Sequence, residues 1–325
     1  MFQWLPMTSN RIATTTQSEL YDCVVVGAGP AGLTALEYLS RFHRRAVALG
    51  GGGPKPRISL VDRTYNLPGF PSGITGAALL ARLAEQAQAM GGEISPAVAA
   101  RIDGSDANFV VTTPSGERLH ARKIILATGV HDREPNIPGI APHVGNFIRY
   151  CPVCDGFEHT GKRLGIIGGG PSVARHALFL RTFSDQITIF LHGAALKDLA
   201  PCASLLRRRG IAVVAAKITN ILEAEPTAEK PHVGCGLRLE DGTEYRLAVL
   251  YSALGCDVHL DPVRHLGLKL DSENYIVTDC RQLTSKPGIY AAGDIVSQVN
   301  QICVAFGQAA IAAVELHQEL GTQET

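Results

Sequence analysis

The sequence predicts a three-layer α/β fold of two similar domains, with the second domain inserted into the first. Short apolar stretches alternate along the chain with helix-like segments, which is typical of a parallel sheet covered on both faces. A glycine-rich loop stands between an apolar stretch and a helix start twice, at 27–32 and at 168–173. The 325 residues also exceed the size of one typical core. Together these observations indicate two Rossmann-like units, each suited to a dinucleotide.

The first unit is predicted to begin at an apolar strand, 23–26, which leads through the glycine loop into a leucine-rich helix. A second strand is expected at 46–49. A hairpin that turns at 114–116 precedes a buried strand at 124–127. The loop glycines allow the backbone to approach a pyrophosphate, and the start of the following helix offers N–H donors and partial positive charge.

The same order of elements returns in the second unit. A strand at 164–167 runs into the second glycine loop, and another strand is expected at 187–190. A hairpin that turns at 241–242 precedes a last strand at 249–253. This internal repeat predicts a second nucleotide-binding domain. Its predicted ligand-binding residues are Gly168, Gly170, Pro171 and Ser172.

The C-terminal part contains one strand-like segment, 288–294, and one alanine-rich helix, 302–320. Because one strand and one helix cannot bury a core alone, we expect them to return to the first sheet. The second unit is then an insertion. The predicted organisation is a flexible extension at 1–20, a first domain at 21–130 and 260–325, and an inserted domain at 131–259.

The amino-acid composition argues against some classes of function but does not identify the activity. Hydrophobic residues make up 46% of the chain and charged residues 18%, with a formal net charge of zero, so nothing drives it toward nucleic acid or an anionic membrane. No stretch reaches the roughly 20 apolar residues of a membrane span. The first twenty residues lack the pattern of a signal peptide. We therefore expect a cytoplasmic protein, and we interpret Arg207–Arg209 as a solvated helix face.

Two of the eight cysteines form a Cys-x-x-Cys motif, Cys151 and Cys154, which is followed by Asp155. Such a pair near a helix start can have a lowered thiol pKa and is typical of a redox centre. A zinc knuckle would need four ligands, and the sequence has no second pair of this spacing, so no metal site is predicted. The other six cysteines are predicted to be small buried hydrophobes: Cys23, Cys202, Cys235, Cys256, Cys280 and Cys303.

The order and spacing of these motifs resemble those of the low-molecular-weight thioredoxin reductases, which are flavoproteins with two dinucleotide-binding domains. The resemblance runs from about Tyr21 to Leu320. Besides the two glycine loops, it rests on the segments 66–70, 127–129, 151–157 and 290–294. A Cys-x-x-Cys-Asp-Gly placed just before a second glycine loop is its most specific mark.

The resemblance implies FAD in the first domain. The first glycine loop would hold the pyrophosphate, segment 127–129 the adenosine half, Asp294 the ribitol chain, and Asn66 and Gln301 the flavin ring. The FAD-binding residues implied in this way are Gly27, Gly29, Pro30, Ala31, Gly32, Asn66, Ala127, Thr128, Gly129, Gly293, Asp294, Asn300, Gln301 and Ile302.

The resemblance also implies roles for the cysteine pair. Cys154 would face the flavin and receive its electrons, and Cys151 would attack the disulfide of thioredoxin or a similar protein. Asp155 would donate and accept the proton of the leaving thiolate. Rotation of the inserted domain near Val130 and His259 would present the pair to flavin and substrate in turn, within a homodimer.

The sequence departs from the family at the second nucleotide site. NADPH-using members carry an arginine pair after the second strand of the inserted domain, whereas here segment 191–197 offers only His192 and Lys197 as cations. The segment lacks the carboxylate of an NAD site. Val173 replaces the third glycine, which should crowd a bound pyrophosphate.

We therefore expect that NADPH is not the direct electron donor. The chain is similar to branches of the family in which ferredoxin supplies the electrons or a second FAD occupies the inserted domain. The retained glycines at 168–170 favour the second FAD. A relaxed NAD(P)H site remains an alternative. Two other functions share the motifs: a small-molecule dithiol oxidase that passes electrons to oxygen, and a non-catalytic flavin redox sensor.

Several side chains near the two loops are left with two interpretations. Tyr150 either stacks on a cofactor ring or packs in the core, and packing is favoured. His159, His176 and His192 either contact a cofactor or serve as surface and capping residues, which is commoner. Arg57 ends a glycine-rich loop that either wraps the adenine or simply connects two elements.

Overall fold

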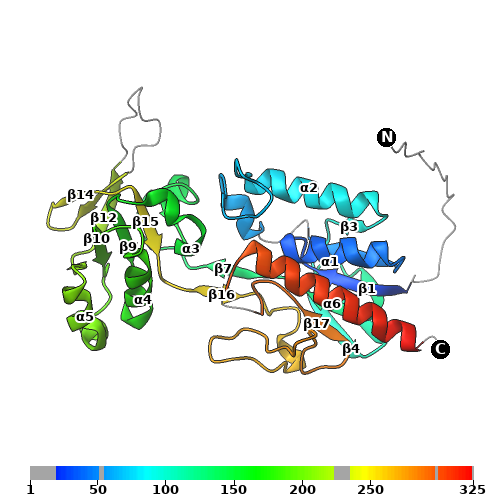
Figure 1. Ribbon diagram of the computed structural model, residues 1–325. Coiled ribbons are helices and arrows are strands. Elements are labelled where there is room, and N and C mark those ends of the chain that lie inside the picture. Colours follow the sequence, from blue (N-terminus) through cyan, green and yellow to red (C-terminus); the bar gives the residue numbers. More distant parts are fainter. Residues whose placement is uncertain (1–19, 51–54, 223–234, 297–298, 324–325) are drawn as a thin grey trace.

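The structure is a computed structural model that describes residues 20–50, 55–222, 235–296 and 299–323. Apart from Leu20, the predicted extension 1–20 lies outside the described residues. Two α/β domains lie side by side and are joined by two extended segments (Figure 1). Their arrangement is that of two Rossmann-like units, with the second inserted in the first.

The first domain is built on a sheet in which β17 returns from the C-terminal part of the chain to pair with β6. The main order is β3-β2-β1-β6-β5-β4, with β1 parallel to both β2 and β6. The strands are β1 (Tyr21–Val26), β2 (Ala46–Leu49), β3 (Glu93–Ser95), β4 (Arg101–Ser105), β5 (Asn108–Thr112), β6 (Arg118–Leu126) and β17 (Ile289–Ala291). The apolar run 23–26 is buried at the centre, which explains its uninterrupted hydrophobicity.

Helices α1 (Pro30–Arg41) and α6 (Ile302–Gln323) pack against each other on one face of this sheet, near α2 (Gly76–Ala89) (Figure 1). Pro30 begins α1, since its missing N–H is not needed in a first turn. Thr75 caps α2 by accepting a hydrogen bond from the Ala78 amide. The alanines that face α1 and the sheet let α6 approach closely, and they are Ala305, Ala309, Ala312 and Ala313.

The inserted domain has a parallel sheet in the order β11-β10-β9-β15-β8, with a small antiparallel sheet β12-β13-β14 beside it. Its strands are β8 (Ile148–Arg149), β9 (Leu164–Ile167), β10 (Ile187–Phe190), β11 (Ala212–Val214), β12 (Ile218–Leu222), β13 (Gly236–Leu239), β14 (Glu244–Arg246) and β15 (Val249–Ser252). Its α-helices are α3 (Pro152–Asp155), α4 (Gly170–Leu180) and α5 (Ala203–Arg208). Short 3₁₀ turns complete the chain: η1 (Arg57–Leu60), η2 (Ala141–His143), η3 (Phe157–His159), η4 (Leu196–Cys202) and η5 (Arg264–Leu266).

The two domains are connected by β7 (Val130–Asp132) and β16 (Cys256–Val258), which pair antiparallel between them (Figure 1). The Thr128 hydroxyl donates to the His259 carbonyl at 2.7 Å, so the two connections are also tied where they leave the first domain. The inserted domain is therefore entered and left through one narrow, two-stranded link.

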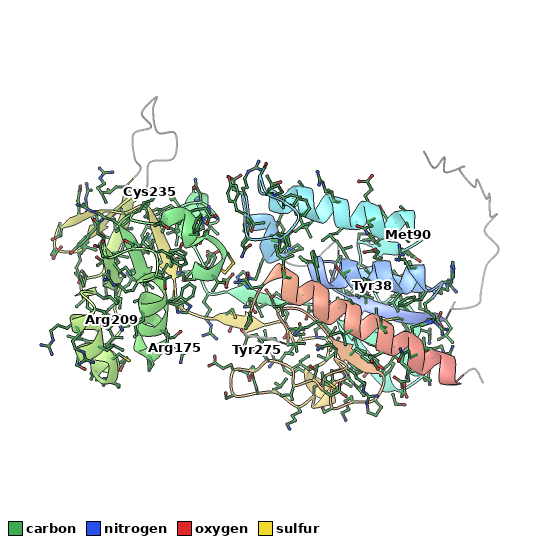
Figure 2. All side chains as sticks on the ribbon, viewed as in Figure 1. Tyr38, Met90, Arg175, Arg209, Cys235 and Tyr275 are labelled. Atoms are coloured by element: carbon green, nitrogen blue, oxygen red, sulfur yellow. A yellow bond between two sulfur atoms is a disulfide. The ribbon has the colours of Figure 1, made fainter. Side chains whose placement is uncertain are left out.

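Some sequence expectations are corrected by the structure. Of the six scattered cysteines only Cys23 is buried, whereas Cys280 and Cys303 are exposed and the other three are half-buried. Isolated cysteines follow their element's exposure, which composition does not reveal. Arg207 to Arg209 are exposed as expected, and Figure 2 shows Arg209 at the outer end of the inserted domain. In the described residues, no helix combines the length and the apolar character needed to cross a membrane.

Candidate active site

A cleft of about 450 Å³ extends along the first domain from the first glycine loop to the cysteine pair. Most of the residues implied for FAD line it, although they come from five separate stretches of the chain. Those that line it are Gly27, Gly29, Pro30, Ala31, Asn66, Ala127, Thr128, Gly129, Gly293, Asp294, Asn300, Gln301 and Ile302. Cys151, Cys154 and Asp155 line the same cleft from the inserted domain.

The glycines of the first loop have different roles. Gly27 has a φ of +114°, and a Cβ there would lie 2.2 Å from the Ala127 carbonyl oxygen. A Cβ on Gly29 would meet only Pro56, at 3.8 Å, so this side of the loop is open toward the cleft. Gly32 is not among the residues that line the cleft. A Cβ there would come within 1.7 Å of the Gly27 carbonyl oxygen, so Gly32 serves helix–loop packing.

The cleft fits the FAD implied by the sequence. The start of α1, whose first amides have no intrahelical acceptor, opens beside Gly29 and suits a pyrophosphate. Gly293 has a φ of +83°, and its amide is fixed by the Gln308 side chain at 2.8 Å. This turn sets Asp294 at the cleft wall.

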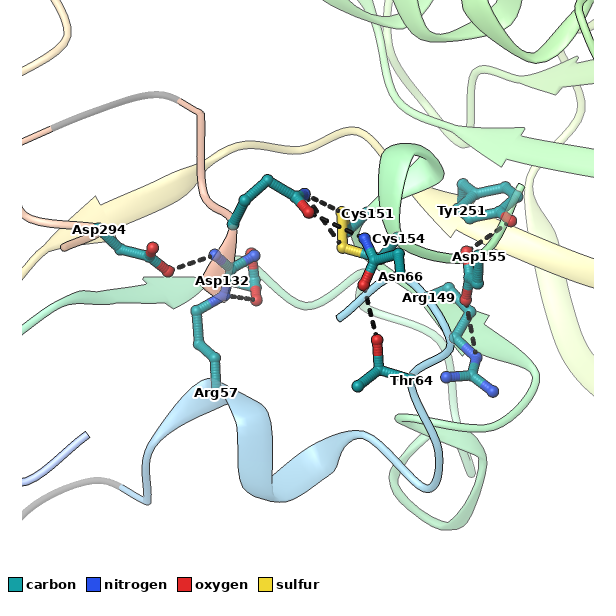
Figure 3. Close-up of a disulfide and its surroundings, with 11 residues drawn as sticks. Arg57, Thr64, Asn66, Asp132, Arg149, Cys151, Cys154, Asp155, Tyr251 and Asp294 are labelled. Carbon is teal, nitrogen blue, oxygen red and sulfur yellow. Dashed lines mark hydrogen bonds and ion pairs between the residues drawn. A yellow bond between two sulfur atoms is a disulfide. The ribbon is translucent and has the colours of Figure 1, made fainter. Parts of the chain in front are cut away.

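Cys151 and Cys154 are joined by a disulfide at the start of the short helix α3 (Figure 3). Gln301, from the first domain, donates its side-chain amide to both sulfurs at 3.3 Å. Its carbonyl oxygen accepts from Asn66 at 2.9 Å, and Asn66 in turn accepts from the Thr64 hydroxyl. A chain of hydrogen bonds thus crosses from the first domain to the disulfide of the inserted domain.

The structure adds an ion-pair cluster that the sequence analysis did not foresee. Arg57 forms a bidentate pair with Asp132 on β7, at 2.7 and 2.8 Å, and also contacts Asp294 at 2.9 Å (Figure 3). Arg57 therefore lies beside the connecting strand, and it also lines the cleft. The two carboxylates raise the pKa of Arg57 even though burial opposes its charge. Burial raises the pKa of Asp132, and Arg57 counteracts this.

Asp155 lies in a second polar cluster behind the disulfide. Its Oδ1 accepts from the Tyr251 hydroxyl at 2.8 Å, and its Oδ2 lies 3.4 Å from Nε of Arg149. Burial raises the pKa of Asp155, while the Tyr251 hydrogen bond and the Arg149 charge oppose the rise. Sequence reasoning missed Tyr251 and Arg149, because the pairing of β8 with β15 that brings them together is not a local signal.

The second glycine loop lies away from this cleft, between β9 and α4. Gly168, Gly170, Pro171 and Ser172 are all placed there, and none of them lines the cleft. Val173 is fully buried in the core of the inserted domain. A real Cβ therefore stands where Gly32 has none, so α4 and its loop cannot approach as closely as in the first domain.

His176 and His192 contact backbone groups, whereas Nδ1 of His159 is buried without a hydrogen-bond partner among the described residues. His192 uses both ring nitrogens: Nε2 meets the Asn136 carbonyl at 3.1 Å, and Nδ1 accepts from the Ile218 amide at 3.1 Å. His176 contacts the Ser172 carbonyl one turn back. His159 packs edge-on against Tyr251. Tyr150 packs against the inserted domain's core and also lines the cleft.

Comparison with known proteins supports this description. The sequence profile of the pyridine nucleotide-disulphide oxidoreductases matches residues 21–309. A thioredoxin reductase of Bacillus subtilis is 30% identical over 318 residues, which cover 95% of this chain and 98% of the relative. The structure of thioredoxin reductase from Streptococcus pyogenes aligns with a TM-score of 0.85 over 94% of this chain and 100% of its own, and at 24% identity this shows likeness of fold alone.

The Lactococcus lactis thioredoxin reductase in the FR conformation is 27% identical and covers 92% of this chain and 98% of its own, yet its TM-score is 0.58.

Proposed function

Because the chain belongs to the pyridine nucleotide-disulphide oxidoreductase family, we propose that it is an FAD-dependent enzyme that reduces a protein disulfide such as that of thioredoxin. In this proposal, residues 21–130 and 260–325 bind FAD, and residues 131–259 carry the redox-active Cys151–Cys154 pair. FAD, when bound, would supply two electrons for reduction of that pair.

The observation that carries the proposal is the position of the disulfide. Its two sulfurs line the same cleft as the glycine loop and Asp294, and both accept hydrogen bonds from Gln301 of the opposite domain. A disulfide with a purely structural role would have no reason to face a cofactor cleft across a domain boundary. The position of the Cys151–Cys154 disulfide at the cleft favours electron transfer between the bound flavin and the disulfide.

The dithiol chemistry follows from the residues around it. In the reduced pair, the Cys151 thiolate attacks one sulfur of the substrate disulfide, so that one S–S bond breaks and a mixed disulfide forms. The Asp155 carboxyl gives its proton to the first leaving thiolate. The Cys154 thiolate then attacks Cys151, which restores the disulfide and releases the second substrate thiolate, which takes its proton from water. The substrate gains two electrons and the enzyme pair loses two.

This proposal is tested by supplying electrons chemically. The full-length flavoprotein, reduced under anaerobic conditions with dithionite and freed of excess reductant, should convert oxidised thioredoxin to its dithiol. Cys151→Ser and Cys154→Ser should each abolish this conversion while leaving the flavin bound. Conversion at the wild-type rate by either variant would contradict the assignment of the pair.

We further propose that NADPH is not the direct electron donor. Segment 191–197 offers no arginine for a 2′-phosphate, and both nitrogens of His192 are already held by backbone groups. The segment lies close against the loop, since a Cβ on Gly169 would come within 2.6 Å of the Ala194 side chain. The retained glycines favour a second FAD in this domain, and ferredoxin is the other candidate donor.

Two measurements test the donor. Anaerobic mixing of the flavoprotein with NADPH or NADH should leave the flavin absorbance unchanged on the timescale of turnover. Rapid bleaching at micromolar nucleotide would instead identify a relaxed NAD(P)H site. Denaturation of the purified protein should release two flavins per chain if FAD also occupies the inserted domain, whereas one flavin per chain would leave the donor open between ferredoxin and NAD(P)H.

A further inference from the structure

We propose that Tyr251 is a positioning residue for Asp155, whose carboxyl group it orients beside the dithiol and stabilises in the ionised form. The proposal rests on the proposed function, in which Asp155 exchanges the proton of the leaving thiolate. It assigns to β15 of the inserted domain a direct influence on the chemistry of the cysteine pair.

The geometry fixes the carboxyl group from two sides. Tyr251 and Arg149 are register partners on the adjacent parallel strands β15 and β8, and both reach Asp155 at the end of α3 (Figure 3). The Tyr251 hydroxyl donates to Oδ1 at 2.8 Å, and Nε of Arg149 lies 3.4 Å from Oδ2. Tyr251 is only 1% exposed, so its ring cannot turn away without disturbing the core.

Besides Tyr251 and Arg149, two ionisable side chains of η3, His159 and Glu158, lie near the Asp155 carboxyl group. His159, on η3, packs edge-on against the Tyr251 ring with centroids 6.4 Å apart. Burial, together with the charges of Lys162 and Arg149, lowers the pKa of His159 to about 4, so its ring is neutral at physiological pH. Glu158 opposes ionisation of Asp155 by its like charge.

The hydrogen bond from Tyr251 affects the reaction through the proton affinity of the Asp155 carboxyl group. Burial favours the protonated carboxyl, whereas a hydroxyl that donates to the carboxylate favours the ionised form. When the Asp155 proton passes to the leaving thiolate, the resulting carboxylate keeps its hydrogen bond from Tyr251. Without this hydroxyl, the carboxyl group should hold its proton to a higher pH.

The test compares Tyr251→Phe with wild type in the full-length flavoprotein, whose dithiol is first reduced chemically. The reaction with cystine is followed by mass spectrometry as a function of pH, because the thiol released from cystine must be protonated. We expect the breakpoint that Asp155→Asn removes from the profile to move upward by about one pH unit in Tyr251→Phe. In the double variant with Asp155→Asn, the second substitution should have no further effect.

Two controls separate this role from a structural one. With 5,5′-dithiobis(2-nitrobenzoate), whose leaving thiolate needs no proton, Tyr251→Phe should react as wild type does. Tyr245→Phe, on β14 of the same domain, should leave the cystine profile unchanged. An unmoved breakpoint in Tyr251→Phe, or an equal loss with both reagents, would overturn the proposal. A reduced wild-type dithiol that reacts with neither reagent would instead overturn the proposed function, and with it the role of Tyr251.

Discussion

Single residues in this molecule obtain their chemistry from burial and from one or two close partners. Asp155 and Asp132 are both carboxyl groups whose burial raises the pKa, yet each is held by a different cation, Arg149 or Arg57. Neither cation removes the effect of burial entirely. Removing either arginine would therefore leave a buried carboxyl group without its cation, which should destabilise the fold.

The raised pKa of Asp155 predicts the pH dependence of stability. A carboxyl whose pKa is higher in the folded state contributes most below its unfolded pKa, and this contribution is lost as pH rises through the folded value. The unfolding free energy of wild type should therefore fall relative to that of Asp155→Asn as pH rises from 3 toward 7, as chemical denaturation would measure. A difference that grows in the opposite direction would contradict the raised pKa.

The Arg57 cluster gives a second residue-scale prediction. Arg57→Met removes the guanidinium group that neutralises Asp132, whose side chain is only 13% exposed. This substitution should lower the unfolding free energy of the flavoprotein by about 3 kcal/mol. Arg57→Lys keeps the charge but not the bidentate geometry, so its effect should be smaller. Urea denaturation followed by released flavin fluorescence measures both. Equal stabilities of wild type and Arg57→Met would contradict this role.

At the scale of elements, α6 is fastened to the sheet by a buried lysine. Lys123 on β6 is fully buried and forms ion pairs with Asp106 and with Glu319 of α6. The Glu319 carboxylate also accepts a hydrogen bond from the Tyr290 hydroxyl. Glu319→Ala should lower the unfolding free energy by about 2 kcal/mol, because Lys123 and Tyr290 each lose a partner. The exposed neighbour Gln318→Ala serves as the control and should change stability little. Similar values for the two variants would show that the pair does not stabilise α6.

The elements themselves could be predicted from the sequence because their signals are local. The apolar strands 23–26 and 187–190, the glycine loops and the C-terminal helix are each encoded within a few neighbouring residues. The site was predictable only where a motif marks it, as for Cys151 and Cys154. Arg57, Asp132 and Tyr251 carry no motif, since their partners are brought from distant strands. The pyrophosphate role predicted for Gly32 stays a prediction, and the structure adds that this glycine packs tightly against the Gly27 carbonyl.

For the whole molecule, the relative orientation of the two domains would determine what the disulfide meets. Here Gln301 of the first domain donates hydrogen bonds to both sulfurs and holds the disulfide at the cleft. The narrow link of β7 and β16 would allow the inserted domain to rotate. Rotation would carry the cysteine pair out of the cleft and toward a protein substrate.

This view predicts that Gln301 restrains the disulfide. Gln301→Ala removes the hydrogen bonds to both sulfurs, so the rotated arrangement should be more populated and a water-soluble phosphine should reduce the disulfide several-fold faster. Gln318→Ala, on the exposed side of α6, should behave as wild type. Unchanged reduction kinetics in Gln301→Ala would show that this contact does not hold the domains.

The most direct test of the account is a count of the electrons that the flavoprotein accepts. Under anaerobic titration with dithionite, a chain that couples FAD to the Cys151–Cys154 disulfide should take up about two electrons more than its bound flavin accepts, which is about four electrons with one FAD and about six with two, because each is a two-electron couple. The double variant Cys151→Ser/Cys154→Ser should take up about two electrons fewer than wild type with the same flavin content. Equal uptake by wild type and the double variant, with the wild-type disulfide still intact afterwards, would contradict the account.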